Sequence, residues 1–237
     1  MLTRSPARSR RIAALLLAAV TGLALSSCSN DDGGPSASPE DVMAQAKQQL
    51  DDTSGVNMSL STSDLPADVQ GIEEATGTAT HAPAFDGTIT VVLSGQAFDV
   101  PVIAVDGTVY AQVPLTPGWQ DIDPSDYGAP DPAMLMDTEK GFSSLLPATT
   151  GLESGQSVRG GENNDEILTE YTGTVPGDVV KNVIPSATGD FDATYTVSED
   201  GELRQATLTG VFYPDSDSMT YTISFDDYGT EKEISAP

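Results

Sequence analysis

Cys28 is the residue whose chemistry stands out, because it is the only cysteine in the 237-residue chain. A lone cysteine cannot form an internal disulfide. Its thiol is therefore a buried small apolar group, a nucleophile or a point of covalent attachment. A nucleophilic thiol needs a basic partner that lowers its pKa. The one histidine, His81, lies about fifty residues away along the chain, which disfavours catalysis at Cys28.

Residues 25–28, Leu-Ser-Ser-Cys, match a bacterial lipobox, in which an aliphatic and two small residues precede the cysteine. The thiol accepts a diacylglyceryl group as a thioether. The two serines allow a peptidase to cut directly before Cys28, and the new terminal amine is then open to acylation. Two or three acyl chains anchor a protein stably, whereas one chain is marginal. Cys28 is therefore predicted to be the lipidation site.

The segment before Cys28 has the organisation of an export signal. Four arginines lie within residues 4–11, and an uncharged apolar run follows from Ile12 to Leu25. This run is short for a membrane span, which needs about 20 apolar residues. An uncleaved anchor or a buried helix is the alternative interpretation. We predict a cleaved lipoprotein signal peptide over residues 1–27.

Residues 28–38 are predicted to form a flexible tether, because they are polar and rich in Gly, Ser and Pro, with no apolar face to bury. Residues 39–237 are predicted to form a single domain. Once acylated, Cys28 would hold this domain at the outer face of the plasma membrane.

The mature chain is strongly acidic. Cleavage before Cys28 leaves six basic residues against 36 acidic ones, a formal charge of −30. Such a surface excludes phosphate-backbone binding to nucleic acid as a main function. It also disfavours electrostatic docking on anionic lipid head groups. The simplest interpretation of the acidity is solubility outside the cytoplasm.

Hydrophobic periodicity predicts an α+β fold. Residues 39–52 carry a helical stripe behind an N-cap, Ser38, and Gly55 follows the helix. From Val56 onward the period becomes two, and Asp106-Gly107 and Asp200-Gly201 indicate tight hairpins. Roughly nine strands are expected, with a broken helix pair over 131–149 and a two-turn helix near 175–185. The order predicts one large antiparallel sheet with helices against one face.

Recognisable catalytic and metal-binding patterns are absent from the sequence. It contains no nucleophile elbow, no zinc-protease motif, no phosphate-binding loop and no Cys/His cluster. The acids of residues 121–132 lack EF-hand spacing, since Asp126 stands where the glycine belongs. A surface calcium site of another kind at these acids is the alternative. His81 is expected to be structural. We predict no catalytic residues, no resident metal and no cofactor.

The sheet face offers two interpretations. Ile89, Val91 and Leu93 share one face of their strand, and aromatic residues make up only 6% of the chain. An aliphatic face under loosely apolar helices could leave a cavity for alkyl chains. An ordinary filled aliphatic core fits the same composition.

Five segments resemble the actinobacterial lipoprotein family LppX/LprA/LprF/LprG, with its LprG members as the nearest branch. They are TSGVNMSLST, AFDGTITVVLSG, VIAVDGTVYAQVPLTPGWQDIDP, YGAPDPAMLMDTEKGFSSLL and MTYTISFDDYGTEKEISAP. The resemblance spans residues 39–237. It implies a strongly curved antiparallel half-barrel whose concave face is covered by helices that enclose an apolar cavity.

The resemblance also implies a function. LprG-like members bind acylated glycolipids, namely phosphatidylinositol mannosides and lipoarabinomannan, and also triacylglycerol. They work with a major-facilitator transporter to move lipid from the plasma membrane to the cell envelope. We therefore expect a monomeric, non-catalytic lipid carrier. A scaffolding lipoprotein that supports a transporter without cargo is the alternative, and an acid-based hydrolase is a third, weaker one.

The expected cavity lining comes from two strands and the covering helices. Ile89 occupies the position that matches a cavity-wall residue in the family. The full set of expected lining residues is Ile89, Val91, Leu93, Val109, Ala111, Met134, Leu135 and Leu145. For each of them, plain core packing is the alternative.

Overall fold

The computed structural model describes residues 37–66, 69–127, 129–161, 164–214 and 216–237. Cys28, the expected signal peptide and most of the expected tether therefore lie outside the described residues. The residues from Ala37 to Pro237 form one compact unit.

Helix α1, Pro39–Asp52, begins at a complete capping box. The Ser38 hydroxyl accepts a hydrogen bond from the Asp41 amide at 3.2 Å, and the Asp41 carboxylate accepts one from the Ser38 amide at 3.4 Å. Pro39 supplies a first-turn residue whose missing N–H costs no helical hydrogen bond. The apolar stripe of α1 is buried through Met43, Ala46 and Leu50. The prediction of a helix over 39–52 is confirmed.

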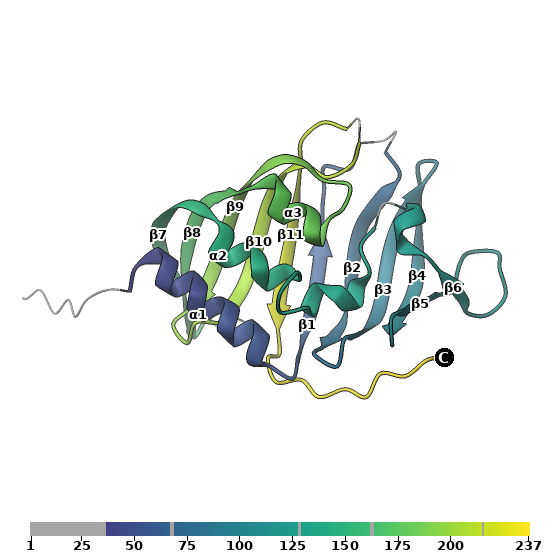
Figure 1. Ribbon diagram of the computed structural model, residues 1–237, viewed down its shortest axis with the longest axis horizontal. Helices are drawn as coiled ribbons and strands as arrows, with labels where there is room; N and C mark the ends of the chain where they lie inside the picture. The colour runs from purple at the N-terminus through teal and green to yellow at the C-terminus, as the bar shows by residue number, and fades with distance from the viewer. Residues whose placement is uncertain (1–36, 67–68, 128, 162–163, 215) are drawn as a thin grey trace, which may run out of the picture. The chain divides into compact units, whose positions relative to one another are not determined.

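In the described part of the chain, eleven antiparallel strands form one sheet in the order β6-β5-β4-β3-β2-β1-β11-β10-β9-β8-β7 (Figure 1). Because β1 lies beside both β2 and β11, the first and last strands close the two halves into one sheet. The strands are β1 Gly55–Ser61, β2 Gly71–Thr80, β3 Ala84–Leu93, β4 Gln96–Val105, β5 Thr108–Ala111, β6 Gln120–Ile122, β7 Thr150–Gly160, β8 Glu166–Val175, β9 Thr188–Ser198, β10 Leu203–Val211 and β11 Met219–Asp226.

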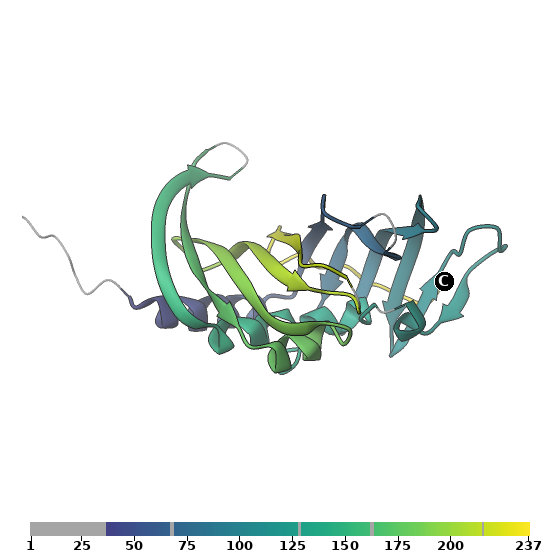
Figure 2. The same cartoon turned by 90° about the horizontal axis from the view of Figure 1, so that it is seen from above.

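The helices lie against one face of this sheet (Figures 1 and 2). Besides α1, the helices among the described residues are short: three 3₁₀ helices, η1 Pro124–Tyr127, η2 Pro132–Met136 and η3 Phe142–Ser144, and two α-helices, α2 Leu145–Ala148 and α3 Gly177–Val183. The broken helical segment and the two-turn helix occur where the sequence predicts them. The prediction of one large antiparallel sheet with helices on one face is confirmed.

Three strands that the hydrophobic pattern does not single out, β2, β6 and β7, bring the sheet beyond the roughly nine strands predicted. Strand β7 is exposed along nearly its whole length, so it shows no apolar–polar alternation. Strand β2 carries glycines and acids and alternates only weakly. Their backbone hydrogen bonds to neighbouring strands, rather than side-chain periodicity, place them in the sheet. The three-residue strand β6 is too short to show a period.

The sheet has an apolar inner face toward the helices and a hydroxyl-rich outer face. Phe142 packs on Phe225 with ring centroids 5.2 Å apart, and Phe212 packs on Phe191 and Tyr221 at 4.9 and 4.6 Å. On the outer face threonines pair across strands, as Thr209 and Thr220 do at 2.9 Å. Alternation at period two therefore sorts the chain into a core side and a solvent side.

A partly buried polar contact fastens the η3–α2 segment to α1. The Lys47 ammonium lies 2.6 Å from the Asp51 carboxylate and donates to the Thr138 carbonyl at 2.6 Å. The Ser143 hydroxyl donates to the same carboxylate at 2.6 Å. These bonds hold in place the chain segment that runs across the inner face of the sheet.

Candidate functional site

An apolar pocket of about 340 Å³ lies between the inner face of the sheet and the segments that cover it. Its volume falls in the range of small-molecule binding pockets. Strands β1 to β6 and β11 form its floor, and η1, η2, η3 and the end of α3 contribute to its cover. The strand residues at its floor include Ile89, Val91, Leu93, Val100, Val102, Val109, Ala111 and Ile223.

Strand register makes this floor continuous. Ile89 lies opposite Val100, and Val102 lies opposite Ala111 on the next strand. Because directly paired residues point to the same face, aliphatic side chains from three adjacent strands meet on the inner side.

Two facing glycines on β2 and β3 make room for the Phe85 ring. Gly77 and Gly87 are paired across these strands, and the Phe85 ring lies over both. A Cβ at Gly77 would come within 2.6 Å of the Phe85 Cζ atom. The ring therefore occupies the space that two side chains would otherwise fill, and it forms part of the pocket wall.

Six of the eight expected lining residues surround the pocket: Ile89, Val91, Leu93, Val109, Ala111 and Leu135. The other two lie elsewhere, which corrects the expectation for them. Met134 points to solvent with 44% of its surface exposed, because the 3₁₀ turn of η2 directs Ala133, Leu135 and Met136 inward instead. Leu145 is completely buried in the core where α2 packs against α1.

Proline-rich cover residues and two tyrosines complete the lining, and the sequence patterns did not identify them. Pro124, Pro130 and Pro132 contribute from the segment that runs from η1 to the start of η2. Tyr213 and Tyr221 contribute from the connection between β10 and β11 and from the start of β11. The sequence signal for the proline-rich cover was the density of prolines after Trp119. Because proline lacks a backbone N–H, such a segment cannot pair as a regular strand.

The two tyrosines form a closed hydrogen-bond network with the bulged start of β2. The Ile72 amide donates to the Tyr213 hydroxyl at 2.9 Å, the two hydroxyls are 3.0 Å apart, and the Tyr221 hydroxyl donates to the Ile72 carbonyl. Burial, reinforced by Tyr213, raises the pKa of Tyr221 far above its ordinary value. Both hydroxyls are engaged by hydrogen bonds within the protein at this end of the pocket.

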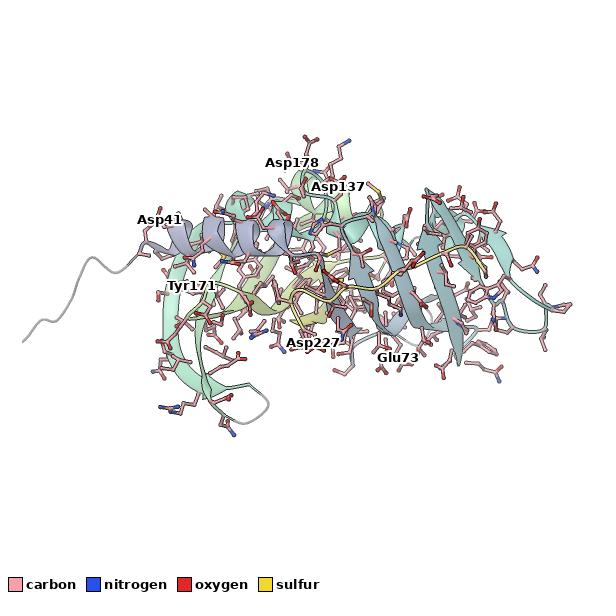
Figure 3. The ribbon with its side chains drawn as sticks, turned by 90° about the horizontal axis from the view of Figure 1, so that it is seen from below. Asp41, Glu73, Asp137, Tyr171, Asp178 and Asp227 are labelled. Atoms are coloured by element: carbon pink, nitrogen blue, oxygen red, sulfur yellow. The ribbon has the colours of Figure 1, made fainter. Side chains whose placement is uncertain are left out.

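The electrostatics of the pocket favour an uncharged ligand. Among the described residues its lining contains no lysine or arginine, and its one carboxylate is the exposed Asp126. A phosphate or carboxylate group would find no cation there. Figure 3 shows carboxylates such as Asp41 and Asp178 on the helical side of the molecule, outside the pocket.

His81 and Asp123 have structural contacts. The His81 Nε2 atom lies 2.7 Å from the Leu50 carbonyl and so ties the end of α1 to the β2–β3 turn. Asp123 accepts hydrogen bonds from the Ser125 amide and hydroxyl, which lower the pKa of its carboxyl. Within the described ranges no group of three or more His, Cys, Asp or Glu side chains is arranged to hold a metal ion.

Fold and pocket together define an α+β protein with an apolar pocket between one antiparallel sheet and its covering helices. The model of the LppX_LprAFG lipoprotein family matches residues 38–235. The chain belongs to this family.

Two curated relatives are similar over most of the chain. The lipoarabinomannan carrier protein LprG of Mycobacterium tuberculosis is 27% identical over 218 residues, which cover 86% of this chain and 88% of the relative. LprG of Mycobacteroides abscessus is 25% identical over 238 residues, with 97% and 99% covered.

Two solved structures share the fold. LprF from Mycobacterium bovis superposes with a TM-score of 0.66 at 13% identity, covering 86% of this chain and 99% of LprF. LppX from Mycobacterium tuberculosis gives a TM-score of 0.57 at 16% identity, covering 82% and 98%. At these identities the likeness concerns the fold alone. In the part of the chain that the structure describes, no helix combines the length and apolarity needed to cross a membrane.

Proposed function

We propose that this protein is an exported, membrane-anchored lipoprotein that carries acylated lipids, including glycolipids, from the plasma membrane toward the cell envelope without chemical catalysis. The observation that carries the proposal is the 340 Å³ aliphatic pocket under the helices, in a chain of the LppX_LprAFG lipoprotein family. Residues 1–27 would be the cleaved signal peptide, Cys28 the acylated residue, residues 28–38 the tether and residues 39–237 the carrier domain.

The mechanism in this proposal is sequestration of alkyl groups from water. Exposure of each methylene to water costs about 0.8 kcal/mol, so a 16-carbon chain costs roughly 12 kcal/mol. Side chains such as Ile89, Val91 and Val109 replace that water contact with apolar contact. A lipid held in this way leaves a bilayer without its tails crossing water.

The cargo class follows from the lack of cations around the pocket. Tails would lie inside and head groups outside, since a charged head group would find no partner in the lining. The naming of the LprG relatives as lipoarabinomannan carriers supports glycolipid cargo. Phosphatidylinositol mannosides, lipoarabinomannan and triacylglycerol are the candidates, a major-facilitator transporter is the candidate partner, and the carrier would act as a monomer at the outer face of the plasma membrane.

Ile89→Trp tests this proposal by filling the pocket from its floor. The variant is made in residues 28–237 with Cys28→Ala, and native mass spectrometry of the purified protein measures co-purified lipid. We expect bound lipid in the parent and at least a tenfold lower occupancy in the variant, since the indole takes the ligand's space.

Val92→Trp is the matched control, because Val92 lies three residues further along β3 and points to the outer face. It should leave the occupancy unchanged. Parent protein that carries no lipid would favour the scaffolding alternative. Equal occupancy in both tryptophan variants would show that lipid binds outside this pocket.

A further inference from the structure

The connection between β5 and β6 presents a fully exposed leucine to solvent. Leu115 is the most exposed large hydrophobic residue among those described; Tyr127, with 56% of its surface exposed, is another. The connection projects beyond the short edge strand β6 (Figures 1 and 2). Leu115 therefore gains nothing from the core of its own domain.

The backbone at Leu115 adopts a conformation that a leucine adopts rarely. Its φ is +68°, in the left-handed region. The Thr116 amide donates to the Val113 carbonyl at 3.1 Å, which closes a turn with Pro114 and Leu115 at its centre. Proline followed by a positive φ fits a type II turn, where glycine or asparagine would sit without strain. Strain of this kind clusters at functional sites.

Leu115 is continuous with the rim of the pocket. The two residues before it, Val113 and Pro114, line the pocket, and so does the exposed Tyr127 of η1. The strained turn therefore holds a leucine side chain out at the place where the pocket meets solvent. A partner that contacts this leucine also faces the route by which a ligand enters.

The charges around Leu115 restrict the kind of partner. No lysine or arginine occurs between residues 105 and 139, while Asp121, Asp123 and Asp126 lie within this stretch and are exposed. An anionic surface would be repelled. The interface of a bilayer with little negative charge accepts a leucine side chain although no basic residue lies nearby. Tyrosine rings also partition into such an interface.

We propose that Leu115, supported by Tyr127, is an interfacial anchor that enters the surface of a weakly charged lipid bilayer and presents the pocket rim to it. This inference rests on the proposed lipid-carrier function. A single leucine binds a bilayer weakly. Attachment of the protein to the same bilayer through Cys28 would make the contact of Leu115 intramolecular and so raise its occupancy. Weak contact also permits release once the cargo has entered.

Trp119, the only tryptophan of the chain, reports on this contact from four residues away. Residues 28–237 are coupled through Cys28, the only thiol, to maleimide lipids in phosphatidylcholine vesicles. Brominated phosphatidylcholine should quench Trp119 emission in the parent and lose most of that quenching in Leu115→Asn. Asparagine tolerates the positive φ, so the turn is retained and circular dichroism should be unchanged. Added phosphatidylglycerol should also reduce the quenching.

Val158→Asn is the control, because Val158 is an exposed hydrophobic residue on the distant strand β7. It should leave the quenching intact. Absent quenching, or equal quenching in Leu115→Asn, would overturn the anchor. A Leu115-dependent dimer in sedimentation, without quenching, would assign the residue to self-association and would also overturn it.

The transfer of a fluorescent acyl lipid from the same vesicles separates the two proposals. If the anchor serves carriage, Leu115→Asn slows transfer about tenfold at unchanged equilibrium occupancy. Quenching without any lipid transfer would leave the anchor standing and overturn carriage. Transfer at an equal rate in parent and variant would overturn the anchor's role in cargo exchange.

Discussion

Tyr195 joins the helical cover to the sheet through one buried hydrogen bond. The Thr149 hydroxyl donates to the Leu145 carbonyl at 2.9 Å and lies 2.8 Å from the Tyr195 hydroxyl. Because the one proton of Thr149 is used on Leu145, Tyr195 must donate to Thr149. Burial raises the pKa of Tyr195 to about 12.

Alkaline pH should therefore weaken the fold through Tyr195. Its folded pKa lies above the unfolded value near 10, so its contribution is complete below pH 10 and is lost as the pH rises through about 12. Between these values the loss is about 2–3 kcal/mol. Tyr195→Phe should have a lower free energy of unfolding at neutral pH. That free energy should also fall less than the parent's between pH 10 and pH 12. Urea unfolding at a series of pH values measures both effects.

Tyr110→Phe is the matched control, because Tyr110 is half-buried and alternates with the inward-facing Val109 and Ala111 of β5. Tyr171, Tyr221 and Tyr228 also have raised pKa values through burial, so both variants should keep part of the alkaline decline. An alkaline profile of Tyr195→Phe that parallels the parent's would contradict the assignment.

Strands β2 and β3 position the pocket floor by approaching closely at a glycine pair. A Cβ at Gly87 would come within 2.2 Å of the Thr76 carbonyl oxygen and 2.7 Å of the Phe85 ring. The first neighbour is backbone and cannot move without disturbing the strand. The absence of a side chain at Gly87 is therefore required by the sheet itself.

Gly87→Ala should destabilise the domain by about 1–3 kcal/mol or more, as overpacking of a core commonly does. It should also push the Phe85 ring toward the pocket and lower lipid occupancy. The midpoint of urea unfolding measures the first effect and native mass spectrometry the second. Thr88→Ala, the next residue on the outer face, should cost much less. An unchanged midpoint in Gly87→Ala would argue against this packing.

Like charge dominates the molecule as a whole. Among the described residues, the ion pairs engage only the carboxylates of Asp51, Asp86, Glu166 and Glu202. The 36 acidic residues of the chain far outnumber its ten basic ones. Self-repulsion at low ionic strength therefore opposes the compact state.

Added sodium chloride should stabilise the protein between about 0.01 M and 0.15 M, since the screening length falls from about 30 Å to about 8 Å. A gain of about 1 kcal/mol corresponds to about 2–4 °C in Tm for a domain of this size. Calorimetry with sodium chloride and choline chloride distinguishes screening from a specific cation site. A Tm that rises with sodium chloride but not with choline chloride would contradict screening.

Much of the architecture followed from local patterns in the sequence. The capping box with its apolar stripe determined α1, and alternation at period two placed Ile89, Val91 and Leu93 on one face. Those signals are local, because a helix turn or a strand pleat relates residues only a few positions apart. The lipidation of Cys28 stays a prediction, since it depends on enzymes that act on residues outside the described part of the chain.

Only the tertiary structure decided whether the aliphatic face is filled or open. The pocket depends on η2 turning Leu135 inward and Met134 outward, on Gly77 facing Gly87, and on Tyr213 meeting Tyr221 at the start of β2. Tyr213 and Tyr221 also contact Ile72, which lies 141 and 149 residues earlier in the chain. No local period encodes contacts between strands and their cover, because they depend on how the elements pack. The free volume is what remains when distant elements pack together, and it exists only after the strands have found their register and the cover has closed over them.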